Sequence, residues 1–270
     1  VAGKYKFDEI LIDVRNLASK AGVSFVKAEI EGIDLKKKKL LLARRPEIEY
    51  SLLSLNIGTT TNFTSKSSIS SDEKLAVPIK PFSESLEFII DQDIYKDDPS
   101  AKPFVIIGAG FAGIEIAFSL RNRWPKRPIQ LKVKPSTKLT KNILRTIHDL
   151  HIEIIYDNPS ALYPALICTG NKSFKWIQDS RLPIDNCGRV LTEDTLQVVN
   201  YPELFAVGDC GVIRDYPRPS SGVWAVRSAK PLAINLEIIS KGIKLKKWKP
   251  QRKAVQILDI KSTNKESKAF

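Results

Sequence analysis

One junction in the sequence constrains the fold more than any other feature: a short apolar run that meets a glycine-rich turn. Residues Phe104 to Ile107 are wholly apolar and rich in β-branched side chains, which is typical of a parallel strand buried on both faces. The turn that follows, Gly108 to Gly113, reads G-x-G-x-x-G, and Ile116 and Leu120 then keep one face of a helix apolar. A strand, such a turn and a helix in this order predict the start of a βαβ unit.

The residues after this turn continue the alternation of helix and strand. We expect a helix at 113–124, a strand at 129–133, a helix at 139–150, and strands at 152–156 and 165–168. Because alternation of this kind specifies a doubly wound sheet, the predicted fold class is α/β.

The glycine turn predicts a dinucleotide site. Its glycines let the chain bend tightly and let backbone approach a pyrophosphate, while the helix N-terminus supplies N–H donors and partial positive charge. In NAD-binding units the second strand normally ends in Asp or Glu, which holds the ribose hydroxyls. Here that strand ends instead in Lys132 and Lys134. These lysines either meet the 2′-phosphate of NADP or are solvated surface lysines, so the choice of nicotinamide cofactor stays open.

The rest of the chain reads as shorter elements, followed by a second site signal. We expect a helix at 5–21, a hairpin of strands 24–30 and 39–43, a strand at 51–58, a loop at 59–73, a helix at 82–90, strands near 190 and at 204–207, and a helix at 221–240. The strand at 204–207 ends in Gly208-Asp209. This places a carboxylate where the ribityl and pyrophosphate groups of a flavin can be held, and Gly208 permits close approach.

Composition excludes several other classes. The three cysteines are far apart and the two histidines have no third ligand near them, so neither a disulfide framework nor a metal site is indicated. No apolar run approaches the roughly 18 residues of a membrane span, and we expect a cytoplasmic protein with at most peripheral contact at the inner face of the membrane. The net charge of +13 is concentrated in Lys36 to Lys39 and in Lys241 to Lys253, which invites an anionic partner.

The order of the motifs resembles that of the pyridine nucleotide-disulfide oxidoreductase superfamily. The glycine turn with Glu115 comes first, then the strand at 165–168, then Leu204 to Asp209, and Leu52 to Thr59 matches the first of that family's two crossings between domains.

A narrower resemblance is to type II NADH dehydrogenase-like proteins associated with, or fused to, selenide, water dikinase. Val77 to Pro81, Arg218 to Arg227 and Trp248 to Arg252 carry it. It implies a flavoenzyme that uses FAD and NAD(P)H and passes a hydride from nicotinamide to flavin and on to a small-molecule acceptor, either a quinone or a selenium or sulfur species. It also implies a selenide, water dikinase partner or fusion, no nucleic acid, no catalytic side chain beyond the cofactors, and no metal.

The resemblance implies two Rossmann-like, three-layer domains, of which the FAD-type domain is discontinuous and truncated at its N-terminus. The expected segments are 1–98 for the first part of the FAD-type domain, 99–178 for the NAD(P)-binding domain, 179–240 for the second part of the FAD-type domain, and 241–270 for the start of a C-terminal region. The residues implied for NAD(P) are Gly108, Gly110, Phe111, Ala112, Gly113, Glu115, Thr169 and Gly170. Those implied for FAD are Gly58, Thr59, Gly208, Asp209, Ala225 and Val226.

Two features of the sequence do not match this interpretation. The family's first G-x-G-x-x-G, which binds the ADP half of FAD, has no match in the sequence, and the chain contains no Met. We therefore expect native residues to be missing, between Tyr156 and Ala165 or within Thr59 to Glu73. The competing hypothesis is a basic module that binds nucleic acid or an anionic membrane surface without redox activity.

Overall fold

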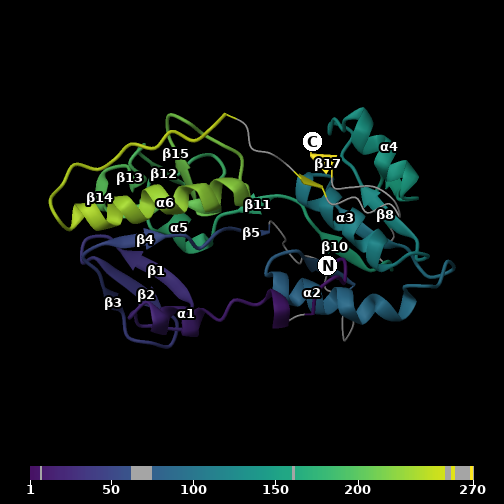
Figure 1. The fold of residues 1–270 in the computed structure, drawn as a ribbon, viewed down its shortest axis with the longest axis horizontal. Helices are drawn as coiled ribbons and strands as arrows, with labels where there is room; N and C mark the ends of the chain where they lie inside the picture. The colour runs from purple at the N-terminus through teal and green to yellow at the C-terminus, as the bar shows by residue number, and fades with distance from the viewer. Residues whose placement is uncertain (7, 62–74, 160–161, 253–256, 259–267, 270) are drawn as a thin grey trace. The chain divides into compact units, whose positions relative to one another are not determined.

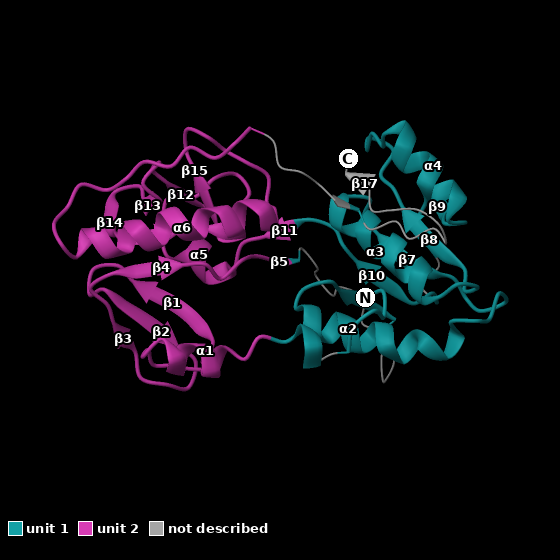
Figure 2. Ribbon diagram, viewed as in Figure 1, with its two compact units in different colours: residues 1–11, 61–170, 255–270 teal, residues 12–60, 171–254 magenta. Residues whose placement is uncertain are grey.

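The computed structural model describes residues 1–6, 8–61, 75–159, 162–252, 257–258 and 268–269. The chain forms two compact units (Figure 2). Unit 1 comprises residues 1–11, 61–170 and 255–270, and unit 2 comprises residues 12–60 and 171–254. Both segments in which we expected missing residues include positions that lie outside the described ones.

Unit 1 is built around a five-stranded sheet in the order β6-β10-β7-β8-β9, in which every pair is parallel. Figure 1 labels β8 and β10 of this sheet together with α2, α3 and α4. Its elements are η1 (Asp8–Ile10), β6 (Ala76–Pro78), α2 (Phe82–Asp91), η2 (Gln92–Tyr95), β7 (Phe104–Ile107), α3 (Phe111–Arg123), β8 (Ile129–Lys132), α4 (Lys141–Asp149), β9 (Glu153–Ile155), β10 (Ala165–Ile167), β16 (Ile257–Leu258) and β17 (Lys268–Ala269). The predicted strand at 104–107 and the alternation that follows it are thereby confirmed.

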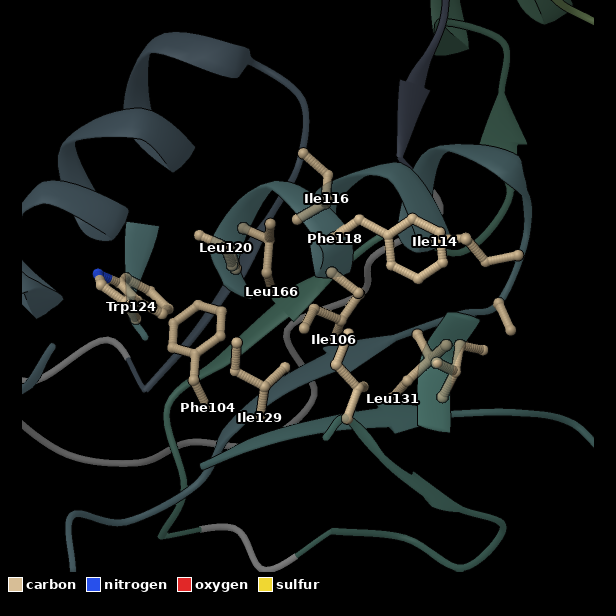
Figure 3. Close-up of a cluster of buried hydrophobic side chains, with 14 of the residues drawn as sticks. Phe104, Ile106, Ile114, Ile116, Phe118, Leu120, Trp124, Ile129, Leu131 and Leu166 are labelled. Carbon is tan, nitrogen blue, oxygen red and sulfur yellow. The ribbon is translucent and has the colours of Figure 1, made fainter. Parts of the chain in front are cut away.

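Apolar side chains between α3 and the sheet form the core of unit 1. Figure 3 shows Ile106 of β7, Leu131 of β8 and Phe118 of α3 gathered in this layer. The central strand β7 is buried as its sequence predicts, because Phe104, Val105 and Ile106 are each 0% exposed. This packing fixes the start of α3 against the ends of the central strands.

Unit 2 contains a mixed sheet in the order β15-β12-β13-β14-β4 and a separate antiparallel sheet in the order β1-β2-β3. Its elements are α1 (Val14–Lys20), β1 (Ile30–Asp34), β2 (Lys39–Leu42), β3 (Ile48–Glu49), β4 (Leu53–Leu55), β11 (Asn171–Lys172), α5 (Lys175–Asp179), β12 (Val190–Thr192), β13 (Gln197–Val198), β14 (Tyr201–Ala206), η3 (Gly208–Cys210), β15 (Gly211–Ile213) and α6 (Gly222–Ile239). Strand β5 (Thr60–Thr61) pairs with β11 where the chain passes between the two units.

Two local predictions in the N-terminal part are wrong. The helix expected at 5–21 is limited to η1 and α1, because Asp13 caps α1 by accepting a hydrogen bond from the backbone of Asn16 (3.0 Å) and so sets its start. The first hairpin strand begins at Ile30 and not at residue 24, because β1 takes its register from the antiparallel partner β2.

The units also divide the chain differently from the segments expected on sequence. Residues 61–98 were assigned to the FAD-type domain but lie in unit 1. The reason is that β6 pairs with β10, at the edge of the sheet that holds the glycine turn. The crossing back into unit 2 comes at Gly170, before the expected boundary at residue 178.

Candidate functional site

The glycine turn of unit 1 lies at the carboxyl end of β7, between the ends of β8 and β10. The backbone N–H of Gly108 donates to the carbonyl of Lys132 at the end of β8 (3.1 Å), and Cys168 N–H donates to the carbonyl of Ile107 (2.9 Å). Gly108 has a φ of +115°, and a Cβ there would lie 2.8 Å from Cγ2 of Thr169. Backbone and side chains from three strands therefore hold the turn at the point where strand order reverses, which is where doubly wound sheets bind ligands.

The other two glycines of the turn differ in the space around them. A Cβ on Gly113 would lie 1.8 Å from the carbonyl oxygen of Gly108, so only glycine lets α3 pack this closely on the turn. A Cβ on Gly110 would meet nothing within 4 Å. The space beside Gly110 is consequently open for a ligand.

Gly110 is also the N-cap residue of α3, and no side chain caps the helix there. The first backbone N–H groups of a helix have no partner within the helix and favour an anion. The first turn of α3 contains no acidic residue. Glu115 is the fifth helical residue and is partly exposed, while burial of the rest of the side chain raises the pKa of its carboxyl.

The remaining residues implied for NAD(P) surround this turn. Thr169 and Gly170 follow β10, and Gly170 has a φ of +64°. Phe111 packs against the core of unit 1, and Ala112 is exposed beside the turn. The structure thus brings both glycine-containing segments to the carboxyl ends of the neighbouring parallel strands β7 and β10.

The residues implied for FAD gather at one end of the unit 2 sheet. Strands β4 and β14 are parallel, with Leu55 opposite Ala206, so both end at the same edge. Gly58 and Thr59 follow β4, and Gly208 and Asp209 follow β14 in η3. Gly58 has a φ of +71° with nothing within 4 Å of a built Cβ, while Asp209 is half-buried.

The N-terminus of α6 meets the same edge. Ser221 caps the helix by accepting a hydrogen bond from Val223 N–H (3.3 Å), and a Cβ on Gly208 would lie 3.6 Å from Cβ of Ala225. The side chain of Val226 is 76% exposed. Most of the residues implied for FAD therefore lie at the carboxyl ends of β4 and β14 or near the start of α6. They are Gly58, Gly208, Asp209, Ala225 and Val226.

A pocket beside Gly208 adds residues that the sequence did not single out as a site. Thr192, Trp224 and Trp248 line it, together with Ser221 and Arg218. Thr192 is 0% exposed, and its hydroxyl has no hydrogen-bond partner within the described chain. Of these five residues only Thr192 had no signal in the sequence, because the other four belong to the segments that carried the narrower resemblance.

The cysteines are not arranged for redox chemistry. Cys210 is buried, and its thiol donates to the carbonyls of Leu55 (3.3 Å) and Val207 (3.2 Å), which ties the ends of β4 and β14 together. Burial raises the pKa of Cys210, and it raises the pKa of Cys168 to about 12. All three cysteines are unpaired by disulfides.

In the described part of the chain, no group of three or more His, Cys, Asp or Glu is placed to hold a metal ion. His148 lies near the end of α4, whereas His151 lies beyond it with a φ of +50°. None of the helices described is long and apolar enough to cross a membrane.

The lysine-rich stretch 241–252 is largely engaged with unit 2. Lys247 pairs with Asp194 (3.0 Å), Lys241 pairs with Glu237 (2.6 Å), and Trp248 packs into an apolar cluster. Near the other basic run, Lys38 pairs with Glu203 (3.3 Å). Part of the positive charge is thus already neutralised within the fold.

Comparison with solved structures shows the fold first. The chain shares its fold with two-domain reductases of known structure. It superimposes on NADH:rubredoxin oxidoreductase from Clostridium acetobutylicum with a TM-score of 0.72 and 18% identity, over 100% of this chain and 72% of that one. A ferredoxin reductase from Rhodopseudomonas palustris gives a TM-score of 0.66 and 19% identity, over 89% and 63% of the two chains.

Among curated proteins, the sequence is similar to ferroptosis suppressor protein 1 from several vertebrates. The protein of that name from Xenopus tropicalis is 24% identical over 267 residues, which is 84% of this chain and 67% of the relative. The chain thus spans about two thirds of the length of this relative. No family model matches the sequence.

Proposed function

We propose that this chain is the main part of an FAD-dependent NAD(P)H oxidoreductase. The observation that carries the proposal is the open, uncapped start of α3 at Gly110, placed at the point of strand reversal between β7 and β10. The fold and the homology to ferroptosis suppressor protein 1 support the same class. The basic-module hypothesis loses support, because Lys241 and Lys247 of the lysine-rich stretch are paired with carboxylates and Trp248 packs within unit 2.

In this proposal the nicotinamide dinucleotide binds in unit 1. Its pyrophosphate lies beside Gly110, where the first backbone N–H groups of α3 donate to it, and Thr169 and Gly170 follow the neighbouring strand β10. Gly108 and Gly113 shape the turn and leave the ligand side free of side chains. The residues present therefore fit the group.

The flavin is proposed to bind at the shared edge of β4 and β14 in unit 2. There Asp209 accepts hydrogen bonds from the ribityl hydroxyls, and Gly58 and Gly208 let backbone approach. Ala225 and Val226, near the start of α6, contact the flavin ring. The cradle beside Gly58, which a Cβ would enter without contact, fits a ligand in van der Waals contact with backbone.

When both cofactors are bound, the nicotinamide supplies a hydride and the flavin accepts it. The protein's own contribution is to position the two cofactors and to keep its buried thiols in the unreactive, protonated form. Cys168 and Cys210 stay protonated at neutral pH because burial raises the pKa of each thiol. We therefore assign no side chain to proton or group transfer.

The electron acceptor is proposed to be a quinone, a selenium or sulfur species, or a small electron-carrier protein. The last class is suggested by two of the structural neighbours, which are named for rubredoxin and ferredoxin. The relatives named above give no support to a selenide, water dikinase partner.

The experiment is reconstitution of the purified chain with FAD, followed by NAD(P)H oxidation assays with each acceptor class. We expect retention of yellow flavin through gel filtration and acceptor-dependent oxidation of NAD(P)H. Colourless protein that consumes no NAD(P)H with any acceptor, yet binds RNA or anionic vesicles in low salt, would favour the basic module instead.

A further inference from the structure

The end of strand β8 carries positive charge where NAD-binding units carry a carboxylate. Gln130 and Lys132 alternate with the buried Ile129 and Leu131, so both project from the same face of β8. The exposed Lys134 comes two residues after the last residue of the strand. The carbonyl of Lys132 accepts the hydrogen bond from Gly108 N–H. This contact fixes the end of β8 directly beside the glycine turn, where the adenosine ribose of a bound dinucleotide lies.

The segment that continues from β8 brings no carboxylate to this place. Residues 129–140 contain neither Asp nor Glu, and a turn closed by Thr137 N–H donating to the carbonyl of Lys134 (2.8 Å) follows the strand. Ser136, Thr137 and Lys138 are exposed in this turn. A ribose with free hydroxyls would find no acceptor carboxylate here, whereas a phosphate would find ammonium and hydroxyl groups.

The charges of the two lysines are not neutralised by neighbours. The ammonium of Lys132 is hydrogen-bonded to the neutral side-chain amide oxygen of Asn158, which follows β9. Lys134 is exposed, and within the described residues no carboxylate pairs with either lysine. The positive field at this edge is therefore available to a ligand, in contrast to the paired lysines of the 241–252 stretch.

We propose that Lys134, assisted by Lys132, selects NADPH over NADH by binding the 2′-phosphate. The inference rests on the proposed function, because it assumes that unit 1 holds a nicotinamide dinucleotide. Lys134 contacts the phosphate as a flexible point charge, and Lys132 adds to the field from the last position of the strand. An acidic residue at position 134 would instead suit the free hydroxyls of NADH.

The test measures binding, so it does not depend on a working acceptor. Affinities of the full-length protein for NADPH and NADH are compared by the fluorescence of the bound nicotinamide. Since hydrogen bonds to charged groups are worth more than neutral ones, we expect at least about a tenfold preference for NADPH, and a smaller one as salt is added. Lys134→Glu should abolish or reverse the preference, and Lys134→Gln should reduce it while keeping the backbone unchanged.

Lys126→Glu is the matched control. It makes the same charge change at an exposed lysine before the opposite, amino end of β8, and should leave the ratio of affinities unchanged. Equal wild-type affinities, or a ratio that Lys134→Glu leaves intact, would overturn the inference while the proposed function stands. If neither dinucleotide binds, the proposed function fails as well.

Discussion

A Cβ built on Gly113 lies 1.8 Å from the carbonyl oxygen of Gly108. Helix α3 therefore packs on the turn before it at a distance that only glycine at position 113 allows. Gly113→Ala should therefore force the turn away from the helix and lower the free energy of unfolding by at least about 3 kcal/mol. Thermal or urea unfolding measures this loss. Wild-type stability in this variant would show that the close packing is not real.

Gly110→Ser tests the same turn for ligand binding and not for packing. Serine is a good N-cap residue and its Cβ meets nothing within 4 Å, so the stability should be unchanged or slightly higher. Its hydroxyl would occupy the N–H groups proposed for the pyrophosphate, and the dissociation constant of NAD(P)H should rise at least about tenfold. Unaltered affinity would remove Gly110 from the site.

Asp209→Asn should weaken flavin retention without unfolding unit 2. The change removes the charge of a half-buried carboxylate at the edge shared by β4 and β14. The exposed Asp215, which follows β15, supplies the matched control Asp215→Asn. The flavin content after gel filtration should fall for the first variant only. Equal flavin content in both variants would contradict the assignment of Asp209.

The pair Asp93 and Arg123 gives a prediction about acid stability. The Asp93 carboxylate accepts hydrogen bonds from Arg123 Nε and Trp124 Nε1 (both 2.7 Å). Partial burial opposes ionisation, but these bonds outweigh it and hold the pKa of Asp93 below its ordinary value. The stabilisation is thus present above the unfolded value of 3.8 and is lost as the pH falls through the lower folded pKa. Asp93→Asn should flatten this acid loss in unfolding measurements across that range.

The cysteines should differ in reactivity. Cys187 is exposed, whereas burial raises the pKa of Cys168 to about 12 and also raises the pKa of Cys210. Because the thiolate is the reactive form, iodoacetamide at neutral pH should label Cys187 in the native protein and the other two only after unfolding. Mass spectrometry of the labelled peptides measures this. Rapid labelling of Cys210 in the native protein would contradict its buried position between the ends of β4 and β14.

The unit 1 fold could be predicted from sequence because its signals are local. The apolar run before Gly108 and the periodicity of the following helix each determine one element, and a parallel sheet buries such strands on both faces. The start of α1 was missed because the cap at Asp13 outweighs the apolar spacing before it. The register of β1 was missed because it is set by pairing with β2, a tertiary interaction.

The candidate site could likewise be predicted only where its residues stand in local motifs. Gly110 and Asp209 stand in motifs that the sequence shows directly. Thr192 comes to the pocket beside Gly208 only through the pairing of β12 with β15, and no local pattern marks a single buried threonine. The place of β6 in the unit 1 sheet likewise depends on a long-range pairing with β10.

The most direct test of the central claim is anaerobic mixing of the FAD-reconstituted protein with NAD(P)H while the visible absorbance of the flavin is followed. If the chain carries both sites, the absorbance will bleach in a single phase whose rate saturates with NAD(P)H concentration, and Gly110→Ser will raise the concentration needed for half-saturation. Bound flavin that keeps its absorbance at saturating NADPH and NADH would contradict the assignment of this chain as a flavin-dependent NAD(P)H oxidoreductase.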